Sequence, residues 1–445
     1  MISQKVWSYI GSEHNILDLY PLASTVSLAK VWAGTPLHDA VHPYPPALAY
    51  YFTAIGWMHK LMLPATGNLV VDSGSLEFII KFANTLFGLA DSVLIYLIVR
   101  GLGLSRRSSF FSGGLFLFNP GVWSSMTIWG QPEVVVLFPL LLSVLLANRN
   151  KPFGAWLALG VLAITRLQMA IPVVILALVY SKRFTLRENI PAISWSIIII
   201  FILLSPFSLR YGPSSALESL WRPMVSQRFG GAIEQGQLTV SRGAYSIWPL
   251  ITGYLERESG RERSLVLDGE ELVGGWSYRQ VSNYLVAGLL LAVAVAIVLK
   301  RRANMTGNYY LPLLALAMLG WALLTTGMSA RYLIYPLCLL MLARPALSGG
   351  GFLAGVAMIS TTIAITVLGT FAFHISGVPE LVPALHADNN AGARLFMFLY
   401  SDDRVITLGS FGNMVVLVWL AAAVFRLPLL PWGRGNKEVA ADSEE

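Results

Sequence analysis

Long apolar runs alternate with short polar connections over most of the chain. Runs that approach the roughly 20 residues needed to cross a bilayer as a helix predict membrane-spanning segments. The predicted spans, about eleven, are 76–100, 108–126, 134–147, 153–165, 169–181, 190–207, 282–299, 308–326, 332–346, 351–373 and 410–426. The pattern therefore predicts an all-α, polytopic transmembrane helix bundle with interfacial helices on its outer face.

Two neighbouring spans, 153–165 and 169–181, are shorter than most of the others. At about 1.5 Å per residue each is about 20 Å long, which is less than the roughly 30 Å hydrocarbon core. Their connection, 165–168, is therefore expected to lie below the outer surface. A break in helical backbone at that depth is tolerated only beside protein or a water-filled cavity.

The segment 44–63 is apolar enough to cross the membrane, but its aromatic residues and its Pro-Pro entry favour helices that lie on the outer interface. If the segment 44–63 crossed the membrane, every later loop would lie on the opposite side of the membrane from the one predicted. With the segment outside, Lys and Arg collect in the loops predicted to be cytoplasmic, as the positive-inside rule requires.

The spans and loops divide the chain into five predicted regions. They are an outer-face region with interfacial helices (1–75), a transmembrane module (76–207), a large extracytoplasmic loop (208–281), a C-terminal transmembrane module (282–430) that includes an outer loop (374–409), and a cytoplasmic polar tail (431–445).

The composition agrees with a membrane protein. The 445-residue chain is 55% hydrophobic and 12% charged, whereas about a quarter of the residues of a soluble domain are charged. The net charge of +7 does not indicate a nucleic-acid partner, because the cations follow the positive-inside pattern. We predict a multi-pass protein of the plasma membrane in a prokaryote or of the endoplasmic reticulum in a eukaryote.

Four charged residues depart from the ordinary membrane pattern. Arg166 and Arg331 fall on predicted outer turns that are otherwise poor in cations. Lys81 and Asp91 fall within or at the edge of a span, where a charge is costly and often functional. Because about 15 Å of helix separates these two, they are too far apart to pair directly, and a structural role with partners on other helices is expected.

The turn 129–133 is polar between two apolar runs. A tryptophan such as Trp129 is ordinary at a membrane interface, but Gln131 and Glu133 are not. The Glu133 carboxylate requires water or a cation, and Arg166, at the tip of the next hairpin, is the expected partner.

Acidic and histidine side chains cluster in the first outer region, at Glu13, His14, Asp18, His38, Asp39 and His42. Such clusters suggest a general base or a metal site. The spacing of these acidic and histidine residues matches no strong metal motif, so we predict no definite cofactor. A divalent cation bound by them stays an alternative. Solvated surface acids are a further alternative for each carboxylate taken alone.

Several short segments occur in a distinctive order between about residues 14 and 345. They are DLYPLASTVSLAKVWAGTPLHDAVHPYPPALAYYF, FIIKFANTLFGLADSVLIYLIVRGLG, LFNPGVWSSMTIWGQPEVV, ITRLQMAIPVVIL, VSRGAYSIWPL and TTGMSARYLIYPL. In this order they resemble the GT-C superfamily of membrane glycosyltransferases, which use polyprenyl- or dolichyl-phosphate sugars on the outer or lumenal side.

In the first two segments, the resemblance places Asp18 at the catalytic aspartate position and Tyr44 at the entry of an interfacial helix. Lys81, Asn84 and Asp91 match positions in the second span of polyprenol-dependent mannosyl- and glucosyltransferases.

In the next two segments, Trp129 and Gln131 match the Trp-Gly-Gln-x-Asp motif, with Glu133 in place of its aspartate. Arg166 replaces the lysine of a Thr-Lys-x-Gln motif, and Gln168 matches its glutamine.

The last two segments supply one aromatic pair and one cationic turn. Tyr245 and Trp248 match an Asn-Ala-Tyr-Asn-x-Trp motif whose two asparagines are replaced here. Arg331 and Tyr332 match a Met-His-Glu-Arg-Tyr turn that lacks its His-Glu pair. The resemblance implies a substrate cavity lined by Trp129, Gln131, Glu133, Gln168, Asp39, His42, Tyr44, Lys81, Tyr245, Trp248 and Tyr332.

The resemblance implies transfer of a hexose such as mannose or glucose from a polyprenyl-phosphate donor to a hydroxyl of an extracytoplasmic glycan, lipid or protein. Asp18 would be the general base, and Arg166 with Arg331 would bind the phosphate leaving group. A single base together with cations that bind the phosphate favours inversion of configuration at the anomeric carbon. Retention of configuration would need a second carboxylate, Asp39 or Glu133.

Two other classes of function fit the same helices and intramembrane charges. One is a transporter or flippase for a lipid-linked sugar, and the other is a non-catalytic membrane scaffold. An enzyme requires Asp18 beside the anomeric carbon of the donor, whereas a transporter requires acids near the midplane of the membrane.

Overall fold

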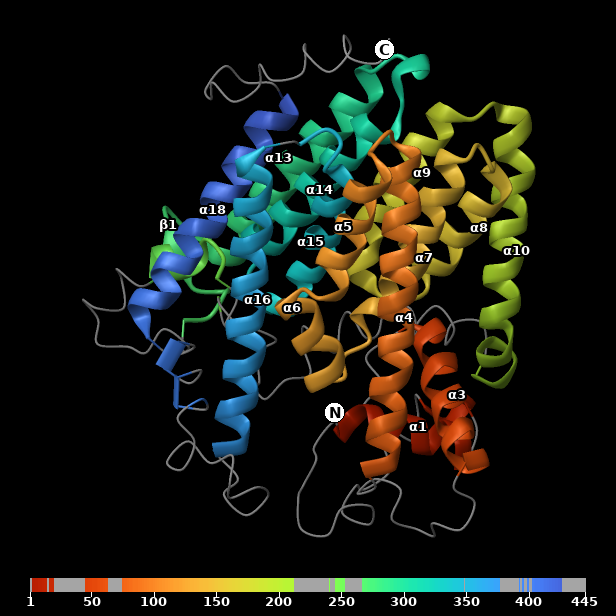
Figure 1. Cartoon of the computed structure of the whole chain (residues 1–445), viewed down its shortest axis with the longest axis horizontal. Helices are drawn as coiled ribbons and strands as arrows, with labels where there is room; N and C mark the ends of the chain where they lie inside the picture. The colour runs from red at the N-terminus through yellow and green to blue at the C-terminus, as the bar shows by residue number, and fades with distance from the viewer. Residues whose placement is uncertain are drawn as a thin grey trace. The chain divides into compact units, whose positions relative to one another are not determined.

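The computed structural model describes residues 2–13, 16–19, 45–62, 74–211, 240, 245–252, 266–347, 349–376, 392, 394–395, 398–399 and 402–425. Most of these residues are helical, and the strands among them, β1 (Glu271–Val273) and β2 (Trp276–Ser277), form one antiparallel hairpin. The predicted all-α fold class is confirmed (Figure 1).

Two compact units divide the chain. One comprises Met1–Ile98 with Ser109–Leu238, and the other comprises Val99–Ser108 with Thr239–Glu445.

The first unit contains most of the helices of the N-terminal half. They are α1 (Ile2–Glu13), η1 (Ile16–Leu19), α3 (Pro46–Met62), α4 (Gly74–Gly101), α5 (Arg106–Leu117), α6 (Pro120–Trp123), the π-helical turn η4 (Ser124–Ile128), α7 (Glu133–Asn148), α8 (Pro152–Ala163), η5 (Leu167–Met169), α9 (Ala170–Arg183) and α10 (Leu186–Tyr211). The connection between α4 and α5 groups with the second unit.

Helix α1 packs closely against α3. Glycines permit the approach: a Cβ added at Gly56 would lie 2.1 Å from the Ser8 carbonyl oxygen, so a larger residue would push the helices apart. Trp7 meets Phe52 at a ring-centroid distance of 5.2 Å in the same interface. The short helix η1 contacts α1, α3 and α10, which gives the segment that carries Asp18 a fixed place within this unit.

Helix α8 packs between α7 and α10. Its few polar contacts are internal: the Trp156 indole donates to Asn189 Oδ1 at 2.8 Å, and Ser143 Oγ donates to the Ala155 carbonyl at 2.8 Å. Satisfying polar groups inside the helix bundle is what a membrane environment demands, because hydrocarbon offers no hydrogen bonds.

The second unit contains α13 (Tyr278–Leu299), η7 (Arg302–Asn304), α14 (Gly307–Leu324), η8 (Ala330–Leu333), α15 (Ile334–Ala343), α16 (Gly350–Ser376) and α18 (Asp403–Phe425). Helices α14 and α15 form its core and are buried along nearly their whole length. Around them, α13 and α18 pack against α14, and α16 packs against α15. Because α14 is buried so completely, the turn at its end has a well-defined place within the unit.

Within the part of the chain that the structure describes, six helices are long and apolar enough to cross a membrane: Gly74–Gly101, Leu186–Phe207, Tyr278–Leu299, Gly307–Leu324, Gly350–Gly369 and Asp403–Phe425. Shorter apolar helices cover Glu133–Asn148, Pro152–Ala163 and Ala330–Ala343. The chain is thus a multi-pass membrane protein by the length and composition of its helices. The larger number of about eleven crossings stays a prediction.

The predicted continuous span 108–126 is wrong. Helix α5 ends at Leu117, and Asn119 begins a new helix by accepting hydrogen bonds from the backbone N–H groups of Gly121 and Val122. Pro120, at the first helical position, cannot continue the preceding helix but suits the start of the next one. The expected break between 153–165 and 169–181 is confirmed, since α8 ends at Ala163 and α9 begins at Ala170.

Candidate functional site

The charged end of α4 is a small ion-pair cluster. Lys81 Nζ lies 2.6 Å from Glu77 Oε1, one turn earlier on the same helix, and Lys5 Nζ of α1 lies 3.2 Å from Glu77 Oε2. The expectation that Lys81 pairs with another helix is therefore wrong, because the helical repeat supplies an acid four residues away. The Lys81 and Glu77 side chains are 29% and 35% exposed, so this pair contributes little to stability.

Helix α3 makes two polar contacts with α4. The Tyr51 hydroxyl donates to Asn84 Oδ1 at 2.7 Å, and burial raises the pKa of the Tyr51 phenol above its usual value. His59 Nε2 lies 3.0 Å from Ser75 Oγ, and burial lowers the pKa of His59. Both groups therefore stay neutral near pH 7, and these contacts hold α3 on α4 without charge.

Asp91 lies further along α4 and is fully buried. Among the described residues neither of its carboxylate oxygens has a hydrogen-bond partner, so the expectation of a partner on another helix is also wrong. A buried acid without hydrogen bonds is costly in a membrane helix, and such residues are often retained for function.

We expect Asp91→Asn to raise the thermal unfolding temperature by about 2–4 °C, the shift that about 1 kcal/mol produces in a unit of this size. The reason is that asparagine keeps the shape of the side chain but removes the ionisable carboxyl. Thermal unfolding of the detergent-solubilised protein would measure the effect. Asp268→Asn is the matched control, because its buried carboxylate has partners, and it should lower the unfolding temperature. A lowered value for Asp91→Asn would contradict the expectation.

The segment 119–133 changes helix type before it reaches Glu133. In η4 the Trp129 N–H donates to the Ser124 carbonyl at 3.0 Å, a π-helical bond, and Gln131 N–H donates to the Ser125 carbonyl at 3.0 Å. Gly130 then adopts a φ of 69°, in the left-handed region that glycine tolerates best. Single π-helical turns are frequent at functional sites, and this one directs Gln131 and Glu133 into the interior of the unit.

Glu133 and Arg166 form a buried ion pair. Arg166 Nη1 donates to Glu133 Oε1 at 3.0 Å, and the two side chains are 0% and 1% exposed, respectively. Arg166 has extended backbone between α8 and η5, where the break in the hairpin allows its side chain to reach the start of α7. The predicted pairing is confirmed. Because the guanidinium is withdrawn from solvent and already bonded to a carboxylate, its burial argues against direct contact with a lipid phosphate.

The polar neighbours of this ion pair differ in burial. Gln131 is buried, while Trp129 and Gln168 are half-buried. Within the described part of the chain the Gln131 side-chain oxygen has no hydrogen-bond partner, which is unusual for a buried amide. The turn 129–133 is thus a polar, partly unsatisfied region beside the break between α8 and α9.

In the second unit, Tyr245 and Trp248 are buried and donate to backbone carbonyls. The Tyr245 hydroxyl bonds Leu399 O at 2.9 Å, and the Trp248 indole N–H bonds Leu324 O at 3.0 Å. Asn413 of α18 donates its amide to the Tyr245 carbonyl at 2.8 Å. These contacts hold the segment 245–252 against helices of the unit, so their observed role is structural.

Arg331 lies on η8, at the end of the turn that follows α14, and is half-buried. Its Nη2 donates to the Tyr332 hydroxyl at 3.2 Å, and its guanidinium carbon lies 5.1 Å from the centroid of the same ring. Trp321 and Tyr335 flank Tyr332 at centroid distances of 6.2 and 6.4 Å. This arrangement presents a cation on an aromatic support, which suits recognition of an anion linked to an apolar or sugar group.

The remaining candidates lie outside the described residues. Asp39, His42 and Tyr44 are among them, and Asp18 lies on η1 but its side chain is not described. Within the described part of the chain, no three His, Cys, Asp or Glu residues group so that they could hold a metal ion. Arg166 and Arg331 belong to different units, so their convergence on one pocket stays a prediction.

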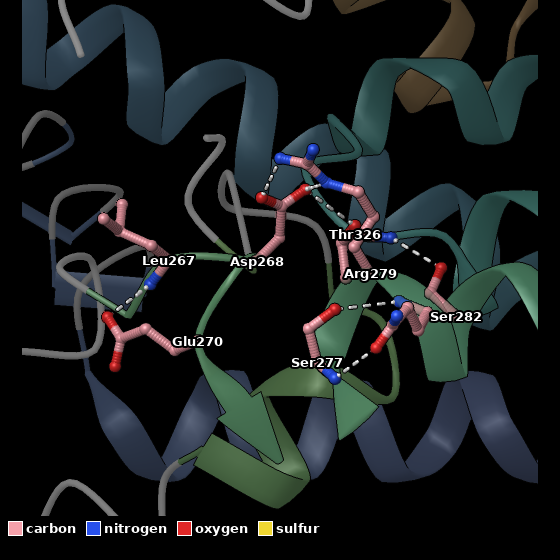
Figure 2. Close-up of polar contacts among 8 residues, drawn as sticks. Leu267, Asp268, Glu270, Ser277, Arg279, Ser282 and Thr326 are labelled. Atoms are coloured by element: carbon pink, nitrogen blue, oxygen red, sulfur yellow. Dashed lines mark hydrogen bonds and ion pairs between the residues drawn. The ribbon is translucent and has the colours of Figure 1, made fainter. Parts of the chain in front are cut away.

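A polar network that the motifs did not indicate joins the β-hairpin to the turn after α14 (Figure 2). Asp268, which is buried, binds Arg279 through two hydrogen bonds and accepts a third from the Thr326 hydroxyl. Its local signal was present in the sequence Ser-Tyr-Arg-Gln: Ser277 and Gln280 form a capping box that starts α13 and so places Arg279 in the first turn.

Comparisons with models of protein families, with curated proteins and with solved structures found no match for the chain.

Proposed function

We propose that this chain is a membrane glycosyltransferase that moves a hexose, mannose or glucose, from a polyprenyl-phosphate carrier to an extracytoplasmic hydroxyl. The order of the sequence motifs supports the class, and the helical membrane architecture is compatible with it. The observation that carries the proposal is the Arg331 turn, where the guanidinium of the half-buried Arg331 lies over the ring of Tyr332, which in turn contacts Trp321.

The phosphate of the donor is assigned to Arg331. As the sugar leaves, negative charge develops on the lipid phosphate, and a fixed guanidinium lowers the barrier because its planar fork can bond two phosphate oxygens. Arg166 is assigned a supporting role instead, because its ion pair with Glu133 holds the turn 129–133 in place.

The base is assigned to Asp18. A carboxylate within hydrogen-bond reach of the acceptor hydroxyl takes its proton as the oxygen attacks the anomeric carbon, while the bond from that carbon to the phosphate oxygen breaks. The helix η1, in contact with α1, α3 and α10, supplies the fixed backbone that such a base requires. One base and one phosphate-binding cation give a single displacement with inversion.

A transporter of lipid-linked sugars is the second candidate, and Asp91 is the observation that favours it. A buried acid in a long membrane helix, with no hydrogen-bond partner among the described residues, is typical of proton-coupled transport. The two functions differ in products, since a transporter moves the intact lipid-linked sugar whereas a transferase releases polyprenyl phosphate.

The test uses the purified protein in liposomes that contain polyprenyl-phosphate mannose or glucose, with release of polyprenyl phosphate as the measurement. We expect Arg331→Gln to lower turnover about a hundredfold, the typical loss when one donor to a developing anion is removed. Arg404→Gln, which changes an exposed arginine at the start of α18, is the matched control and should have no effect. Movement of the donor across the bilayer without cleavage would exclude the transferase.

A further inference from the structure

The end of α14 and the turn 325–329, between α14 and η8, are held by hydrogen bonds to the segments that precede α13. Leu323 and Leu324 lie just before the turn, and Gly327 lies within it. The bonds run from Ile247 N to Leu323 O at 3.1 Å, from the Trp248 indole to Leu324 O at 3.0 Å, and from Gly327 N to Val240 O at 3.0 Å. The end of α14 is therefore attached to this part of the second unit at several successive residues.

Thr326 adds two contacts of its own (Figure 2). Its N–H donates to Ser282 Oγ at 3.2 Å, and its hydroxyl donates to Asp268 Oδ2 at 3.3 Å. Asp268 cannot rotate freely, because Arg279 Nε and Nη2 donate to its two oxygens at 2.9 and 2.6 Å. The Arg279 N–H also donates to the Asp268 carbonyl at 2.8 Å.

These contacts matter because the turn leads directly to Arg331. The backbone of the turn follows an apolar helix, and Gly327 has a φ of 69°, a conformation that other residues adopt at a cost. Packing of apolar side chains alone does not fix such a turn. The bidentate Asp268–Arg279 pair fixes it, because Asp268 Oδ2 also accepts a hydrogen bond from the Thr326 hydroxyl in the turn. These bonds thus give the turn a defined geometry.

We propose that Asp268 and Thr326 are positioning residues for Arg331: the Asp268 carboxylate, oriented by Arg279, fixes the turn that presents the guanidinium to the donor phosphate. The proposal rests on the proposed function, in which Arg331 binds that phosphate. Bidentate recognition of phosphate depends on placement to within about 0.5 Å, so a loosened turn weakens binding even though Arg331 is intact.

The experiment compares Thr326→Val, which removes the hydroxyl, with Thr326→Ser, which keeps it. The measurement is binding of polyprenyl phosphate to the purified full-length protein, together with donor turnover. We expect Thr326→Val to weaken both about tenfold and Thr326→Ser to stay close to wild type. Thr252→Val is the matched control, because Thr252 is also buried and its hydroxyl bonds the Trp248 carbonyl one helical turn earlier.

A double-mutant cycle with Arg331→Gln separates positioning from general stability. If Thr326 acts through Arg331, adding Thr326→Val to Arg331→Gln causes no further loss of binding. An additive loss, or an effect of Thr326→Val no larger than that of Thr252→Val, would overturn the positioning role while the proposed function stands. Unchanged phosphate binding in Arg331→Gln would instead reject the phosphate assignment, and this proposal with it.

Arg279→Lys provides a second variant in case Thr326→Val folds poorly. It keeps the positive charge beside Asp268 but loses the fork that bonds both carboxylate oxygens. We expect it to weaken polyprenyl phosphate binding in the same direction as Thr326→Val, and again only when Arg331 is present. Wild-type binding in this variant would show that the orientation of Asp268 does not matter.

Discussion

Replacing Glu133 with glutamine is expected to destabilise the protein by about 3–5 kcal/mol, because it removes the buried carboxylate that pairs with the buried Arg166 guanidinium. The two side chains are almost fully withdrawn from solvent, so water cannot take over the role of the carboxylate. The loss reflects the removal of a carboxylate from a buried guanidinium more than the strength of one hydrogen bond at 3.0 Å.

The free energy of unfolding, measured in bicelles for each variant, tests this expectation. Arg166→Met combined with Glu133→Met should recover much of the loss, since removing both charges removes the desolvation cost of each. Lys81→Gln is the matched control, because the Lys81–Glu77 pair is about one-third exposed and its loss should cost less than about 1 kcal/mol. A Glu133→Gln variant no less stable than Lys81→Gln would show that the buried pair contributes nothing special.

The Glu133–Arg166 pair was predictable because both residues break the apolar pattern at neighbouring turns. A carboxylate and a guanidinium that are both withdrawn from water tend to form an ion pair. The short helices α8 and α9 leave a break that brings Arg166 within reach of the turn 129–133. Hydropathy and charge together therefore predicted a tertiary contact between residues more than thirty positions apart.

The break after α5 was missed although its local signal is strong. Hydropathy averages over a window of about bilayer length, and within that window 108–126 carries no charged residue. The capping chemistry of Asn119 followed by Pro120 acts over a few residues and decides where a helix begins. Similarly, the spacing of four residues that pairs Lys81 with Glu77 is a local signal in the sequence, and the hydropathy of the whole span does not contain it.

The network around Asp268 lay beyond sequence reasoning for a different reason. Thr326 is 58 positions from Asp268, and no periodic pattern links the turn before β1 to the end of a later helix. In the sequence, Arg279 is one of several arginines in the predicted extracytoplasmic loop 208–281. Its partner is determined by how the hairpin β1–β2 and the capping box of Ser277 place it in three dimensions.

The variant Asp18→Asn is expected to lower donor turnover by about a hundred- to ten-thousandfold, the range for removal of a general base. Asparagine keeps the size of the side chain and cannot accept the proton of the acceptor hydroxyl at neutral pH. The helix η1 that carries it contacts α1, α3 and α10, so this isosteric change should leave the fold intact.

The measurement is release of polyprenyl phosphate by liposomes, with binding of polyprenyl phosphate followed in parallel. If Asp18 is the base, turnover falls while phosphate binding stays at the wild-type level, because the phosphate belongs to Arg331. Arg331→Gln is expected to differ from Asp18→Asn in binding, because it loses phosphate binding as well as turnover. Turnover unchanged in Asp18→Asn would remove Asp18 from the reaction and shift the search for the base to Asp39 or Glu133. Of these two, Glu133 is the weaker candidate, because its carboxylate is already committed to Arg166 inside the first unit.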